Sequence, residues 1–165
     1  MESLGGQLGI VVENLEEFGR VASNLDIATN IEANDIALQL GQITNIMDDL
    51  DFTTFEQFGD SLVRLGNNVA AQESSIMNVA QRLAAIANVT SMTTPQLLGW
   101  SAAIASTGQR SESAATAISN SITGIGKAVS EGGKKLDAFA KIAGMSADEF
   151  KAKWENSSSE ALEAF

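Results

Sequence analysis

The sequence contains no cysteine, no histidine and no tyrosine, and it has one proline in 165 residues. Without cysteine, the chain can form neither disulfides nor thiolate metal sites. Without histidine, it lacks the commonest general base and the commonest metal ligand in proteins. These absences exclude most familiar hydrolase sites before any motif is considered.

Basic side chains are scarce at the start of the chain. Residues 1–60 carry twelve acids and one base, Arg20, whereas residues 61–165 carry nine of each, so the net charge of −11 lies in the first part. We expect one all-helical domain over residues 1–165, with an acidic part (1–60) and a charge-balanced part (61–165). A surface of this sign repels nucleic acid, so we expect no direct nucleic-acid binding. The acids are typical of a solvated face, or alternatively of a docking surface for a basic partner.

A long uncharged run extends over residues 83–109. Polar residues interrupt it, and its apolar part, residues 97–105, is shorter than the ~20 residues that a membrane span needs. We therefore expect a buried core helix and no membrane span.

Apolar residues recur at helical spacing along most of the chain, and no segment alternates with the period of a strand. The pattern predicts helices over residues 8–25 and from about 32, 54, 73 and 95, followed by 112–129, 134–143 and two short helices after Ser146 and Ser157. The four successive starts are ~20 residues apart, which indicates stacked hairpins or weak internal repetition. We predict an all-α array of eight or nine short antiparallel amphipathic helices, a solenoid-like bundle.

Helix ends are marked by local sequence signals. Capping boxes are expected at 53–56, 146–149 and 157–160, and Thr94 is expected to cap a helix that has Pro95 in its first turn. Glu32 is a poor cap for the helix that follows it. The expected stops are glycines: Gly66, Gly108, Gly132, Gly133 and Gly144.

Asp48, Asp49 and Asp51 are the densest cluster of acids. They lack the further oxygen ligands and the turn glycine of a calcium loop, so we interpret them as a polar loop. The serines have no base partner, and Trp100 and Trp154 are interpreted as core residues. We therefore predict no catalytic, metal-binding or cofactor-binding residues and no enzyme. The alternative is a hydrolase that uses only carboxylates such as Asp48 and Asp49.

The amino-acid sequence of several segments resembles the conserved region of phage tail tape measure proteins. The resemblance follows the chain in order and covers nearly all of it; its segments are 7–10, 24–25, 59–68, 73–76, 80–84, 117–119, 129–136, 143–150 and 161–165. It implies a structural role without catalytic residues. It also implies a location inside the tail tube of the virion, assembly in the host cytoplasm, and a part in setting tail length. The implied partners are the tube protein, tail assembly chaperones and other copies.

One continuous helix of 165 residues would span only ~250 Å, and tape measures are usually many hundreds of residues long. We therefore expect this chain to be a segment of a longer protein. An excised segment would expose faces meant for the missing chain, so we also expect self-association. The alternative is a free-standing helical interaction module with an acidic docking face.

Overall fold

A computed structural model describes residues 6–10, 12, 15–47 and 52–165. It is 81% helical, with nine helices and no strand in the described part of the chain. The bounds of the helices are α2 Leu15–Ala28, α3 Ala33–Ile46, α4 Phe52–Asn68, α5 Glu73–Val89, α6 Thr94–Ser106, α7 Ser111–Glu131, α8 Lys134–Ile142, α9 Ala147–Asn156 and α10 Ser158–Ala164. The predicted all-α array is confirmed.

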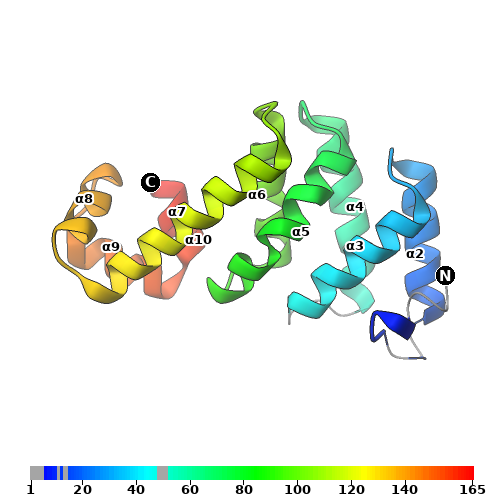
Figure 1. Cartoon of the computed structure of the whole chain (residues 1–165), viewed down its shortest axis with the longest axis horizontal. Coiled ribbons are helices and arrows are strands. Elements are labelled where there is room, and N and C mark those ends of the chain that lie inside the picture. Colours follow the sequence, from blue (N-terminus) through cyan, green and yellow to red (C-terminus); the bar gives the residue numbers. More distant parts are fainter. Residues whose placement is uncertain (1–5, 11, 13–14, 48–51) are drawn as a thin grey trace.

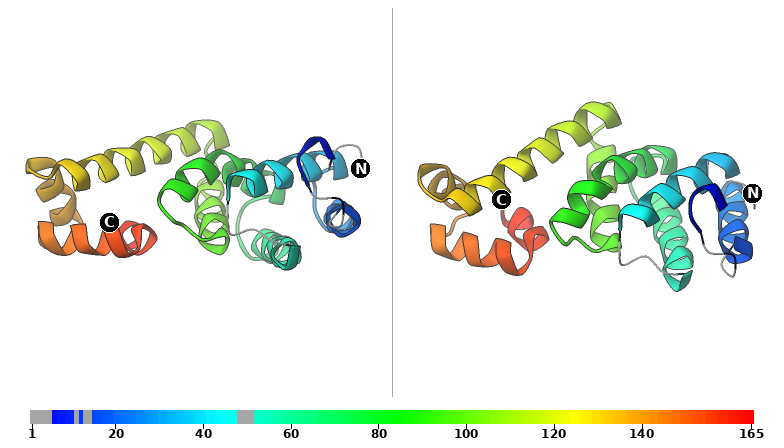
Figure 2. Two further views of the ribbon diagram at one scale, coloured as in Figure 1. Left: turned by 90° about the horizontal axis from the view of Figure 1, so that it is seen from below. Right: turned by 60° about the horizontal axis from the view of Figure 1, so that its bottom comes forward.

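The first six helices form three hairpins stacked side by side. Helices α2, α4 and α6 pack against one another in one layer, and α3, α5 and α7 pack in a second layer. The hairpins follow each other along the long axis of the molecule, and both layers run along that axis (Figures 1 and 2). Helices α3, α5 and α7 begin at residues 33, 73 and 111. The structural repeat is therefore a pair of helices. Its length is about twice the ~20-residue spacing of single helices seen in the sequence.

Helices α5 and α6 hold the centre of the stack because they have neighbours on several sides. Helix α5 contacts α3, α4, α6 and α7, which explains why small residues share its buried face with large ones. Ile76 and Val79 are fully buried there, and so are Ala80 and Ala84, which let neighbouring helices approach closely. Helix α6 is apolar on most sides and buries Leu97, as its sequence predicts.

Polar side chains link neighbouring hairpins between α3 and α5. Asn30 donates to the Ser74 hydroxyl (2.9 Å) and accepts from the Ser74 amide (3.0 Å). Farther along, Gln39 donates to Asn78 at 3.2 Å, and Gln81 donates to Gln42. These bonds fix the register of one hairpin on the next, since each partner would be left unpaired if the helices slid.

The last three helices are short and form an arm on α7. Gly132 and Gly133 have φ values of +72° and +76°, which other residues rarely adopt, and they turn the chain from α7 into α8. Ser157 ends α9 and begins α10, so these two helices meet at a single residue. Ser158 then donates a hydrogen bond to the carbonyl of Thr90, which brings the arm back to the turn between α5 and α6.

Several predicted helix ends are wrong in ways that share a cause. Helix α2 begins at Leu15 and runs to Ala28, whereas the prediction began at residue 8 and placed a connection from residue 26. Residues 8–10 instead lie outside it, where the carbonyl of Leu8 accepts from Asn45 at 2.8 Å. The apolar residues in this segment keep a helical spacing although they lie outside α2, because they pack on the neighbouring α3.

The predicted caps of two helices are displaced. Helix α4 begins at Phe52, so Thr53 lies inside it rather than at its cap. Helix α6 is capped by Thr93 in a reciprocal box with Gln96, and the predicted cap, Thr94, is instead its first residue and is 2% exposed. The error at α6 comes from choosing one of two adjacent threonines, which local sequence cannot rank, whereas α4 begins before both of its threonines.

Gly66 does not end its helix. Helix α4 continues to Asn68, and the backbone of Gly66 is not left-handed. Its role is close approach: a Cβ there would overlap the side chain of Glu73, the first residue of α5. By contrast, Gly108, Gly132, Gly133 and Gly144 all have positive φ, as predicted for helix stops. Glu32 also behaves as expected, since its side chain makes no capping hydrogen bond.

Candidate functional site

The described residues contain no group of three or more acids close enough to hold a metal ion. Asp48, Asp49 and Asp51 lie outside the described residues, so the polar-loop interpretation stays a prediction. Trp100 and Trp154 both pack against the hydrophobic core but are only partly buried, and each also lines a pocket. Their interpretation as plain core residues is therefore incomplete.

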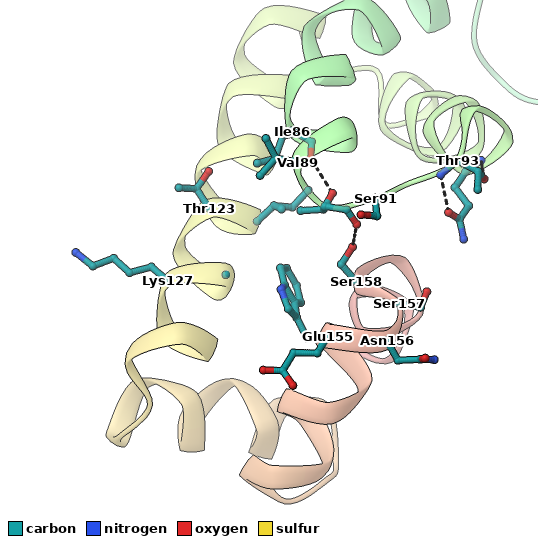
Figure 3. Close-up of a pocket in the computed structure, with 15 residues that line it drawn as sticks. Ile86, Val89, Ser91, Thr93, Thr123, Lys127, Glu155, Asn156, Ser157 and Ser158 are labelled. Carbon is teal, nitrogen blue, oxygen red and sulfur yellow. Dashed lines mark hydrogen bonds between the residues drawn. The ribbon is translucent and has the colours of Figure 1, made fainter. Parts of the chain in front are cut away.

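A pocket of about 730 Å³ lies where the arm returns to the hairpin stack. Its walls come from the end of α5, the turn to α6, the middle of α7 and the junction of α9 with α10 (Figure 3). Apolar lining is provided by Ile86, Val89, Ile122 and Trp154. This volume is in the range of pockets that bind small ligands or a few side chains of a partner.

Two local features shape the pocket. Gly126 of α7 faces the indole of Trp154: a Cβ there would be in ordinary van der Waals contact with Cζ2, at 3.5 Å, so the indole packs closely on α7. On the other side, Ser91 has a φ of +53°, and this left-handed residue reverses the chain between α5 and α6. Thr90, just before it, accepts the hydrogen bond from Ser158 that joins the arm to the stack.

The polar groups of the pocket do not form a catalytic constellation. Hydroxyl groups of Thr90, Ser91 and Thr123 line it, but no histidine is present in the chain to activate them. Lys127 extends from α7 away from the pocket (Figure 3) and lies 3.7 Å from Glu131, and Lys151 lies 3.9 Å from Glu155. The arrangement suits binding rather than proton transfer.

The electrostatics of the described residues are those of an exposed surface. Hydrogen bonds from the Ser146 hydroxyl and amide lower the pKa of Glu149. The hydrogen bond and the charge of Glu56 raise the pKa of Arg20, with Glu17 adding to the effect. All these groups are solvent-exposed, so they stabilise local structure and do not mark a reactive centre.

The sequence did not reveal the pocket, because it depends on the contact between Ser158 and Thr90, which are 68 residues apart. The available signals were the left-handed turn and Gly126, and neither has a distinctive pattern. None of the described helices is both long enough and apolar enough to cross a membrane.

Comparison with known proteins gives a single positive finding. Residues 1–165 match the model of a family described as phage-related minor tail protein. No curated protein and no solved structure matches the chain significantly. The match covers the whole sequence and agrees with a helical architecture that has no catalytic cluster in its described part. The chain therefore belongs to the family of phage-related minor tail proteins, which are structural components of the virion.

Proposed function

We propose that this chain is a segment of a tape measure protein, which lies in the lumen of the growing tail tube and helps to set its length. The observation that carries the proposal is the resemblance of ordered segments from residue 7 to residue 165 to tape measure proteins, within a chain that belongs to a minor tail family. The hairpin stack supports it, because each added helix pair extends the molecule along one axis. The segment has a structural rather than a catalytic role.

The proposed partners are the tail tube protein, tail assembly chaperones and other copies of the same protein. Exposed apolar residues on several helices support such contacts, among them Val89 (81% exposed) and Ile142 (62% exposed). A photo-crosslinking residue placed at Val89 in assembled tails should join the protein to the tube subunit. A tail that yields crosslinks only to outer tail components would contradict the location in the lumen.

The test of the ruler role is removal of one helix pair from the full reading frame in the phage. Deleting residues 33–72 joins Glu32 to Glu73, so that α2 is followed directly by α5. Glu32 is the N-cap of α3, and Gln72 is the N-cap of α5. After the deletion Glu32 takes the N-cap position of α5, so the turn that follows α2 keeps its length.

Tail length by electron microscopy then reports the state of the segment inside the tube. A continuous helix rises 1.5 Å per residue, so tails should shorten by ~60 Å. A stack kept as hairpins would lose one packing distance, ~10 Å. Duplication of the same residues should lengthen tails by the matching amount, and the substitution Val89→Ser, which keeps the chain length, is the control. Normal tails of unchanged length from the deletion would refute the ruler role.

The alternative, a free-standing interaction module with an acidic docking face, is favoured by a specific observation. Glu32 and Asp35 are exposed and have no ion-pair partner among the described residues. Such a module would bind a basic partner with an affinity that falls steeply as salt rises. Unaltered tail length after the deletion, together with salt-sensitive binding of a basic tail protein, would favour this alternative over the ruler.

A further inference from the structure

The first hairpin of the stack has an outer flank that no other hairpin covers. Helix α2 faces α4 with one side, and α3 faces α5 with one side, which leaves the opposite sides toward the end of the molecule. Leu8 covers Gly41 in the middle of α3. Around the turn between α2 and α3, however, Ile27 is 85% exposed and Leu38 is 39% exposed.

Acidic residues lie close in the sequence to these two apolar side chains. Asp26, Glu32 and Asp35 lie at the same turn and are all exposed. Asp26 accepts a hydrogen bond from the amide of Ala33 at 3.0 Å, and none of the three acids has an ion-pair partner among the described residues. We call this surface, made of Asp26, Ile27, Glu32, Asp35 and Leu38, the acidic flank.

The opposite end of the long axis carries a surface of the reverse charge. Figure 1 places α8 at the far end from α2. Helix α8 exposes Lys134, Lys135 and Lys141, and the described structure shows no ion pair for any of them. Ile142 is 62% exposed beside these lysines.

The end of the chain adds apolar area to this surface. Lys135, Phe139 and Ile142 are spaced by four and three residues, so they share one face of α8. The ring of Phe165 packs on Phe139 with centroids 5.7 Å apart, and Phe165 is itself 44% exposed. We call this surface, made of Lys134, Lys135, Lys141, Ile142 and Phe165, the basic flank.

We propose that the acidic flank of one molecule docks on the basic flank of a second copy, so that the chain assembles head to tail. Charge complementarity argues for this occupant: the acidic flank carries three exposed acids, and the basic flank carries three exposed lysines against one exposed acid of α8, Asp137. The two flanks lie at opposite ends of one chain, so the contact is heterologous and extends into a row rather than closing as a symmetric dimer. This proposal rests on the self-association in the proposed function but not on the ruler role.

The test uses the 165-residue chain in sedimentation velocity over a range of concentrations. At about 0.1 M salt, where charges act over ~10 Å, the wild type should form species that grow with concentration. At about 1 M salt, where this reach is ~3 Å, association should weaken. A wild type that stays monomeric at every concentration and salt would overturn the proposal.

Charge reversal then identifies the flanks. Glu32→Lys with Asp35→Lys, or Lys134→Glu with Lys135→Glu, should each weaken association about tenfold or more, because like charges would face each other. The four substitutions in one chain should restore association, because the flanks are then complementary with exchanged signs. Failure of the folded four-substitution chain to recover would overturn the proposal.

Two controls separate docking from general charge and folding effects. Arg110→Glu with Lys127→Glu makes the same charge change on α7, away from both flanks, and should leave association unchanged. Ile142→Ser, which removes an exposed apolar side chain of the basic flank, should weaken association. Circular dichroism of each variant checks folding. The two proposals can be refuted independently, because tail length tests the ruler role and sedimentation tests the docking of the two flanks.

Discussion

The hairpin stack and the C-terminal arm are stabilised in different ways. The second helix of each hairpin has no side-chain hydrogen bond that caps its N-terminus; these helices are α3, α5 and α7. In the arm, Ser146 caps α9 in a full box with Glu149, and Ser157 caps α10. Two helices depart from this contrast, because α6 of the stack has a full capping box and α8 of the arm has no side-chain cap. The longer helices α3, α5 and α7, of 14 to 21 residues, lack side-chain caps, whereas α9 and α10, of 10 and 7 residues, have them.

The largest expected effect is a cavity in the centre of the stack. Ile76 is fully buried on α5, so Ile76→Ala should lower the free energy of unfolding by ~2–5 kcal/mol. Urea denaturation followed by circular dichroism measures the loss. Ile142→Ala, at an exposed position of the arm, should change stability by less than ~0.5 kcal/mol. Equal losses at the two positions would contradict the packing described for α5.

Loss of the N-cap side chain should matter at α9 of the arm and not at α3 of the stack. Ser146→Ala removes an acceptor for the Glu149 amide (3.3 Å) and should cost ~1 kcal/mol. Glu32→Ala, at the equivalent N-cap position of α3, removes no capping bond and should be nearly neutral. Thermal unfolding compares the two variants, and a larger cost at Glu32 would reverse the contrast between stack and arm.

Two glycines provide a test with opposite signs. Gly144, in the arm, has a φ of +73°, so Gly144→Ala should destabilise the protein by ~1 kcal/mol. Gly66 lies inside α4 with ordinary helical backbone, so Gly66→Ala should stabilise it by up to ~1 kcal/mol once the whole Glu73 side chain, whose Cγ would lie 2.6 Å from the new Cβ, turns to another rotamer. Chemical denaturation measures both, and destabilisation by Gly66→Ala would show that Glu73 cannot yield.

The smallest expected effect depends on pH. Hydrogen bonds from Ser146 lower the pKa of Glu149 in the folded protein. The stabilisation is therefore complete above the pKa of an unfolded glutamate, ~4.3, and is lost as pH falls through the lower folded pKa. The Tm difference between wild type and Glu149→Gln should shrink below that range. A difference that grew on acidification would contradict the capping box.

Much of the fold was predictable from the spacing of apolar residues. The buried stripe of α3, from Ile36 through Leu40 to Ile43, and that of α5, from Ile76 to Leu83, were both identified correctly. The capping box of α9 also matched, and of the box predicted at 157–160 the hydrogen bond from the Glu160 amide to Ser157 is present. The ends at Thr53, Gly66 and Thr94 were wrong, since tertiary contacts decide among neighbouring candidates there.

The pocket and the two flanks could not be predicted in the same way. They depend on which helices become neighbours, and the hydrogen bond from Ser158 to Thr90 joins segments that no local pattern relates. Even so, the acidic excess of the first 60 residues was visible in the sequence. What the structure adds is that three of those acids lie at one end and three lysines of α8 at the other.

The nearest-neighbour order of the hairpins has a mechanical consequence. Among the described helices, the α2–α3 hairpin contacts only α4 and α5 beyond itself, apart from contacts weaker than those that define the layers. A pull on one end of the chain would therefore peel off one hairpin at a time, with a separate small force peak for each, rather than break the whole core at once. A protein built in this way can pass through a narrow opening stepwise, because no step requires the complete array to unfold.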